Sequence, residues 1–123
     1  MSYTSFDDVW RYIMSLKGEY VSTLYNPVKN YIQEVNEKGV TRLSARARDK
    51  GKSTNVPKAE FEKVWRNLRE HGKFVPNGKG GWGIACACIA RLPNVEYSCK
   101  DRILALYLRK QNTHLLGQPY EER

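Results

Sequence analysis

The chain has 123 residues, of which 41% are hydrophobic and 11% are aromatic, a composition that favours a packed domain with one core and excludes a disordered tail. The 21 Lys and Arg residues outnumber the 13 Asp and Glu residues and leave a formal net charge of +8. This excess favours a polyanionic partner, most often nucleic acid, although an anionic membrane surface or an acidic protein would also satisfy it.

Two further features concern the compartment. No apolar run approaches the roughly 20 residues that span a bilayer, and the polar start of the chain is unlike a signal peptide. The odd number of cysteines fits a reduced chain better than a disulfide framework. We therefore expect a cytoplasmic protein with no membrane partner.

The first predicted element is a helix that begins with Ser5 as its cap and stops before Gly18. A short extended segment over 19–24 follows. An antiparallel pair is then predicted over 28–35 and 40–47, joined by a turn in which Gly39 supplies the positive φ.

The returning arm of this pair becomes the most basic segment of the sequence. Between residues 42 and 58 a single acidic residue, Asp49, stands among the basic residues Arg42, Arg46, Arg48, Lys50, Lys52 and Lys58. Ser53, Thr54 and Asn55 indicate a turn and offer donors to phosphate oxygens. The segment is predicted either to track phosphates or to be a solvated loop whose charges serve solubility.

The clearest helix pattern covers residues 57–72. Its apolar residues recur at helical spacing on one stripe, with Pro57 suited to the first position and Gly72 to the turn after the last one. The other side carries the cations Lys63, Arg66 and Arg69. We expect these to flank the basic patch if that side faces outward.

A glycine-rich loop is predicted over 73–83, followed by a third helix over 82–92 that Pro93 ends. Lys73, Lys79 and Trp82 make this loop a candidate for holding a phosphate at the helix N-terminus, with Trp82 stacking on a base. The alternative is a flexible connection with Trp82 in the core.

Residues 94–108 fit two structures. Strand-forming Val95, Tyr97, Ile103 and Tyr107 favour a hairpin, whereas Ser98 can instead cap a helix. We favour the hairpin and place Lys100 and Arg102 at its tip. Residues 110–123 are predicted to be a tail or linker, which leaves a single compact domain over 1–109.

The order helix, strands, helix, helix, hairpin predicts an α+β fold of winged helix-turn-helix type, with an N-terminal helix and a β-hairpin before the helix pair. Three stretches, 16–24, 55–65 and 89–97, resemble a DNA-binding module that accompanies bacterial restriction endonucleases. The resemblance implies DNA binding tuned by sequence or base modification in a restriction-modification or phage-defence system. It also implies a nuclease part, which would lie beyond Arg123 or on another chain.

Metal and catalytic chemistry receive little support from the residue spacing. Cys86, Cys88 and Cys99 with His71 suggest a zinc site, but thiols two residues apart on a helix point roughly 200° apart. Neither histidine has a nucleophile or acidic pair at a recognisable spacing. We expect no enzyme activity, no cofactor and no metal.

The resulting hypothesis is binding of double-stranded DNA, mainly through phosphates, with Asn55, Asn77 and Trp82 as candidates for base contacts. The alternative is a small basic protein-binding modulator, for example a phage-type inhibitor of a nucleic-acid enzyme. An RNA-binding module is a third option, although the sequence carries no RRM or KH signature.

Overall fold

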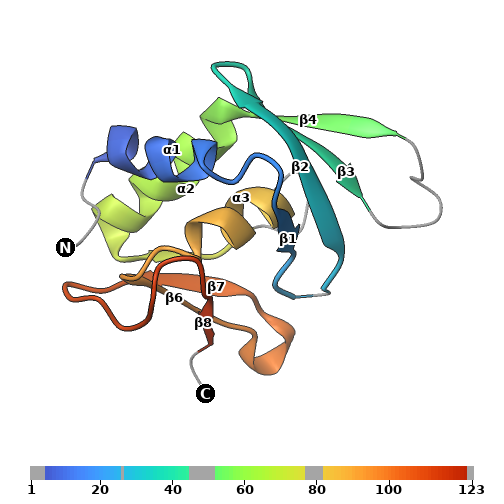
Figure 1. The fold of residues 1–123 in the computed structure, drawn as a ribbon. Coiled ribbons are helices and arrows are strands. Elements are labelled where there is room, and N and C mark those ends of the chain that lie inside the picture. The colour runs from blue at the N-terminus through green and yellow to red at the C-terminus, as the bar shows by residue number, and fades with distance from the viewer. Residues whose placement is uncertain (1–4, 26, 45–51, 77–81, 122–123) are drawn as a thin grey trace.

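The computed structural model describes residues 5–25, 27–44, 52–76 and 82–121, which form an α+β structure (Figure 1). In this part of the chain, three α-helices accompany two four-stranded sheets. In chain order the elements are α1 (Phe6–Met14), β1 (Tyr20–Ser22), β2 (Lys29–Asn36), β3 (Gly39–Ser44), β4 (Ser53–Pro57), α2 (Lys58–His71), β5 (Lys73–Phe74), α3 (Trp82–Ile89), β6 (Val95–Ser98), a 3₁₀ turn (Lys100–Arg102), β7 (Ala105–Leu108) and β8 (Tyr120–Glu121).

Helices α1 and α2 form as the sequence predicts. The Ser5 side chain accepts a hydrogen bond from the Asp8 backbone N–H, and α1 buries Val9, Trp10 and Ile13. Helix α2 buries its predicted stripe and ends at Gly72, whose φ of 72° is the left-handed conformation expected there. The Trp10 and Phe61 rings, 5.4 Å apart between centroids, join the two helices in the core.

The first sheet has the order β1-β2-β3-β4, and each pair of neighbours is antiparallel. Strands β2 and β3 confirm the predicted pair. Gly39 has a φ of 132°, and a Cβ atom at this position would lie only 2.0 Å from the Val56 carbonyl oxygen. Glycine is therefore required both by the turn and by the close approach of β4.

Strand β4 was predicted as a turn, and the structure corrects this. Residues 53–57 pair with β3, where Val56 lies opposite Val40 and both side chains are buried. Ser53, Thr54 and Asn55 are exposed. The composition of these residues is typical of a turn, but they form an edge strand because they are hydrogen-bonded to β3.

The second sheet has the order β5-β7-β6-β8. Its antiparallel β6–β7 pair confirms the predicted hairpin over the alternative helix. Helix α3 lies between the two sheets (Figure 1) and is buried after its first two residues, since residues 84–90 are at most 2% exposed. The small side chains of Ala85, Cys86, Ala87 and Cys88 allow this close packing on all sides.

The predicted order of helices and strands was wrong in this region. Strand β5 separates α2 from α3, so the two do not follow one another as a simple helix pair. Because α3 is buried from Ile84 onward, it has no continuous exposed face to enter a DNA groove as a recognition helix does. The uniformly apolar run that predicted α3 also explains its burial.

Residues 109–121, most of which we expected to be a tail or linker, run back along the domain. The Arg109, Thr113 and Gly117 backbone N–H groups donate to the carbonyls of Asn94, Pro93 and Arg91 at 2.8, 2.7 and 2.9 Å. Strand β8 then pairs in parallel with β6.

Across the described residues, no helix combines the length and apolarity that crossing a membrane demands.

Candidate nucleic-acid interface

A cavity of about 510 Å³ opens where three separate parts of the chain meet. Tyr25 comes from the β1–β2 connection, Trp82 begins α3, and Arg102 belongs to the β6–β7 connection. We call this the Trp82 cavity and define it by its lining residues Tyr25, Pro76, Trp82, Gly83, Arg102, Ile103 and Leu104. Its wall combines aromatic rings, aliphatic side chains and a guanidinium group.

Trp82 is positioned by two neighbouring elements. Its ring meets that of Phe74, on β5, edge to face at 5.4 Å between centroids and an interplanar angle of 62°. The Lys63 ammonium, from the middle of α2, lies 5.5 Å from the Trp82 ring centroid. The indole is half-buried: it packs against the core, as one of the two sequence alternatives expected, and it also lines the cavity.

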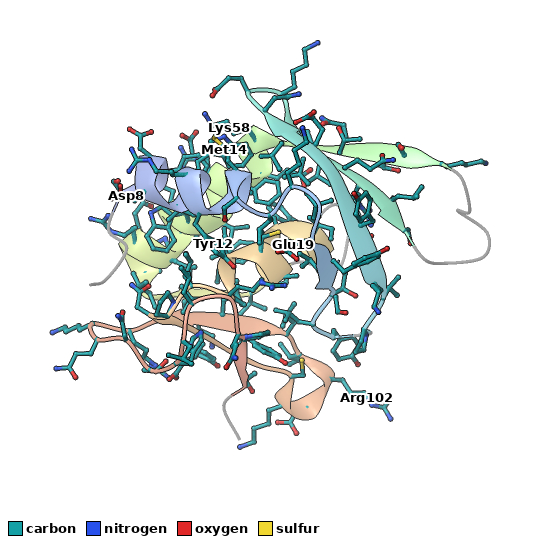
Figure 2. The ribbon with its side chains drawn as sticks, viewed as in Figure 1. Asp8, Tyr12, Met14, Glu19, Lys58 and Arg102 are labelled. Carbon is teal, nitrogen blue, oxygen red and sulfur yellow. The ribbon has the colours of Figure 1, made fainter. Side chains whose placement is uncertain are left out.

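Arg102 lies in a tight turn at the end of the β6–β7 hairpin. The Ile103 N–H donates to the Lys100 carbonyl at 3.0 Å, and the two central residues, Asp101 and Arg102, have φ of 56° and 63°. Positive φ is costly for a residue with a Cβ, and Arg102 is in this conformation without being Asn, Asp or Gly. The turn leaves Arg102 exposed, and its side chain extends outward from the hairpin in Figure 2.

The other predicted cations of α2 and the second sheet lie outside the lining of the Trp82 cavity. Arg66 and Arg69 are exposed on α2. Lys73 lies 5.6 Å from the Tyr107 ring centroid and, with Lys100, lines a separate cavity of about 370 Å³. These residues add positive charge near the hairpin but do not line the Trp82 cavity.

Within the basic segment over 42–58, the described residues belong mainly to the end of β3, to β4 and to the first residue of α2, and the paired strands β3 and β4 project from the body of the molecule in Figure 1. Arg42 donates through Nη1 to the buried Asn30 side chain at 2.8 Å. The Lys58 ammonium pairs with the Glu37 carboxylate at 2.8 Å and lies 5.3 Å from the Trp10 ring centroid. Lys58 is labelled in Figure 2. Both side chains therefore make internal contacts that a phosphate would have to displace.

The remaining predicted residues divide into two groups. Lys52 is exposed at the start of β4, and the Asn55 side chain donates to the Lys38 carbonyl at 3.2 Å, which directs it toward the β2–β3 turn. The others lie outside the described residues, namely Arg46, Arg48, Lys50, Asn77 and Lys79.

Sequence reasoning missed Tyr25 and Ile103 as cavity residues. Both are exposed large side chains, at 41% and 56%, in irregular connections where no periodic pattern marks a shared surface. It also missed an aromatic pair on the outer face of the first sheet, where Tyr20 and Tyr31 lie 5.2 Å apart and Lys29 lies 5.4 Å from the Tyr20 ring. Only the strand register brings these three side chains together.

The cysteines on α3 have the properties of core residues. Burial raises the pKa of the Cys86 thiol and of the Cys88 thiol to about 12, so both thiols stay protonated at neutral pH. The described residues contain no group of three or more His, Cys, Asp or Glu placed to hold a metal ion. A protonated, fully enclosed thiol is a poor metal ligand.

Comparisons with protein-family models, with curated proteins and with solved structures gave no significant match. The resemblance to the module that accompanies restriction endonucleases therefore remains a prediction from the sequence. The function is inferred from the Trp82 cavity and the charges around it.

Proposed function

We propose that the protein binds double-stranded DNA and that the Trp82 cavity, with the cations beside it, is the centre of the contact surface. The observation that carries this proposal is that Trp82 and Arg102, from α3 and the β6–β7 hairpin, line one cavity. Lys63, from α2, lies 5.5 Å from the centroid of the Trp82 ring. Each of the three was predicted from the sequence as a nucleic-acid contact.

The electrostatic part of the proposal rests on exposed cations near the cavity. Arg102 is at its wall, and Arg66 and Arg69 are exposed on α2, the helix that also carries Lys63. Lys and Arg side chains that meet phosphates release condensed counterions, which makes the affinity fall with salt. In this proposal the hairpin tip, with Lys100 and Arg102, contacts the DNA backbone as the wing of a winged helix does.

The β3–β4 hairpin supplies a second set of contacts in this proposal. Lys52 is exposed at its end, and Arg46 and Arg48 belong to the same basic segment of the sequence. Arg42 and Lys58 are left out of the contact set because Asn30 and Glu37 already hold their charged groups. We propose a binding module rather than an enzyme, and a nuclease activity, if associated, would be supplied by a separate part or partner.

The test is a fluorescence-anisotropy titration of a labelled duplex of about 20 base pairs at two salt concentrations. The site variant is Lys63→Gln/Arg102→Gln. Its matched control is Lys17→Gln/Lys38→Gln, which removes the same charge from exposed positions outside the cavity. The Lys17 pair with Glu34, 3.2 Å long and exposed, contributes little to stability, so this control should fold normally.

We expect wild type to bind with a strong salt dependence. The site variant should bind more weakly, with the slope of log affinity against log salt reduced by about two units, while the control keeps most of the slope. The Arg46→Ala/Arg48→Ala variant measures, by the same change in affinity and salt slope, how much the basic segment over 42–58 contributes to binding. If wild type fails to bind duplex at low salt, the proposal fails and the basic protein-binding modulator becomes the leading hypothesis.

A further inference from the structure

We infer that the Trp82 cavity accepts a single nucleobase that has left the base stack of the DNA. This inference rests on the proposed function and names the group that its central site would take. The occupant is a flat heteroaromatic ring that is linked through a sugar to a phosphate, and it requires a stacking surface and a nearby cation in one place.

The cavity offers the stacking surface. Trp82 and Tyr25 both line it, and they come from different segments of the chain. Tyr25 is 41% exposed, so its ring is accessible, and Ile103, 56% exposed, adds an apolar edge. Bases bind proteins without sequence preference by stacking on aromatic side chains, because every base has a π-face.

The charges around the cavity match the rest of a nucleotide. Among the described residues that line it, Arg102 is the charged one, and the Lys63 ammonium lies 5.5 Å from the Trp82 ring centroid. Both are cations, so the cavity complements the phosphate that accompanies a base. Its volume of about 510 Å³ is in the usual range for small-molecule sites, roughly 300–1,000 Å³.

The backbone of the hairpin provides an independent observation. Arg102 has a φ of 63° at a position where glycine would be unstrained. Backbone conformations of this kind concentrate at ligand-binding sites, where the surrounding structure maintains them. The turn thereby keeps Arg102 among the residues that line an aromatic cavity.

A base inside an intact duplex cannot use this cavity, because both of its faces are covered by neighbouring bases. Entry requires unpairing and unstacking, which cost least where the base is mismatched or damaged. The protein should therefore bind a duplex with a central mismatch more tightly than the same duplex fully paired. The expected preference is about tenfold, which corresponds to a mismatch that spares about 1.4 kcal/mol of the cost of unpairing and unstacking.

The experiment compares the dissociation constants of fully paired and centrally mismatched duplexes for wild type, Trp82→Phe, Trp82→Leu and Tyr25→Leu. Trp82→Phe keeps an aromatic ring and should retain most of the preference, whereas the two leucine variants should lose it. Trp82 packs on Phe74, so Trp82→Leu tests folding as well, while the exposed Tyr25 provides a variant that leaves the core intact.

Intrinsic fluorescence gives a second readout. The other two tryptophans, Trp10 and Trp65, are only 4% and 3% exposed, so a base that quenches emission must reach Trp82. The mismatched duplex should quench wild type and leave the emission of Trp82→Phe unchanged.

Three outcomes overturn the inference. Equal binding of paired and mismatched duplexes would refute the base pocket and leave the proposed DNA binding intact. A preference that survives both leucine substitutions would place its origin elsewhere on the protein. Binding of neither duplex would refute the proposed function and the inference together.

Discussion

Arg102→Gly should make the protein more stable and at the same time a weaker DNA binder. Arg102 has a φ of 63° in an exposed turn. A non-glycine residue in this conformation costs about 1–2 kcal/mol, and glycine removes that cost. Glycine also loses more backbone entropy on folding, about 0.5–1 kcal/mol, so the net gain should be roughly 0.5–1 kcal/mol.

This gain is measurable by thermal unfolding. For a chain of this length, a stabilisation of that size raises Tm by about 2–5 °C. In the proposed interface, removal of the guanidinium also removes one phosphate contact, which should reduce the salt slope of duplex binding by about one unit. A substitution that merely damaged the hairpin would lower both stability and affinity.

Lys38→Gly is the matched control. Lys38 is also exposed in a hairpin turn, between β2 and β3, but it is not among the residues with positive φ. The same loss of charge and gain of glycine should therefore lower stability by roughly 0.5–1 kcal/mol and leave the binding slope nearly unchanged. Equal destabilisation by both substitutions would refute the backbone argument, and an unchanged slope for Arg102→Gly would remove Arg102 from the interface.

Other consequences of the fold can be checked separately. Phe61→Ala should reduce the free energy of unfolding by about 3–5 kcal/mol in urea titrations, because Phe61 is fully buried against Trp10; a loss below about 1 kcal/mol would contradict this packing. At pH 8 a thiol-specific reagent should leave Cys86 and Cys88 unmodified until denaturant is added, because burial raises the pKa of each to about 12; rapid modification of either thiol in the native protein would argue against it. Burial lowers the pKa of His114 below its ordinary value of 6.5, so the unfolded chain takes up the proton more readily and stability should decrease as the pH falls below that value. Thermal unfolding of His114→Gln at several pH values should show a weaker dependence than wild type.

Much of the architecture follows from local patterns. The apolar stripe of α2, the Ser5 cap of α1, the Gly39 turn and the β6–β7 hairpin were all predicted and are all present. These features depend on residues close in sequence, whose spacing and backbone preferences are visible directly. Strand β4 was not predicted, because its pairing with β3, and not its composition, makes it a strand.

The arrangement of α3 and of the candidate site could not be predicted in this way. From the residues alone we could predict the excess of positive charge, a helix of small apolar residues within 82–92, and Lys63, Trp82 and Arg102 as candidate contacts. The packing of the chain encloses most of α3 between two sheets, brings Trp82, Arg102 and Tyr25 around one cavity and sets Lys63 against the Trp82 ring. The physical reason is that burial and proximity across distant segments depend on how the sheets pack on the helices, whereas periodicity records only which side of its own element a residue occupies.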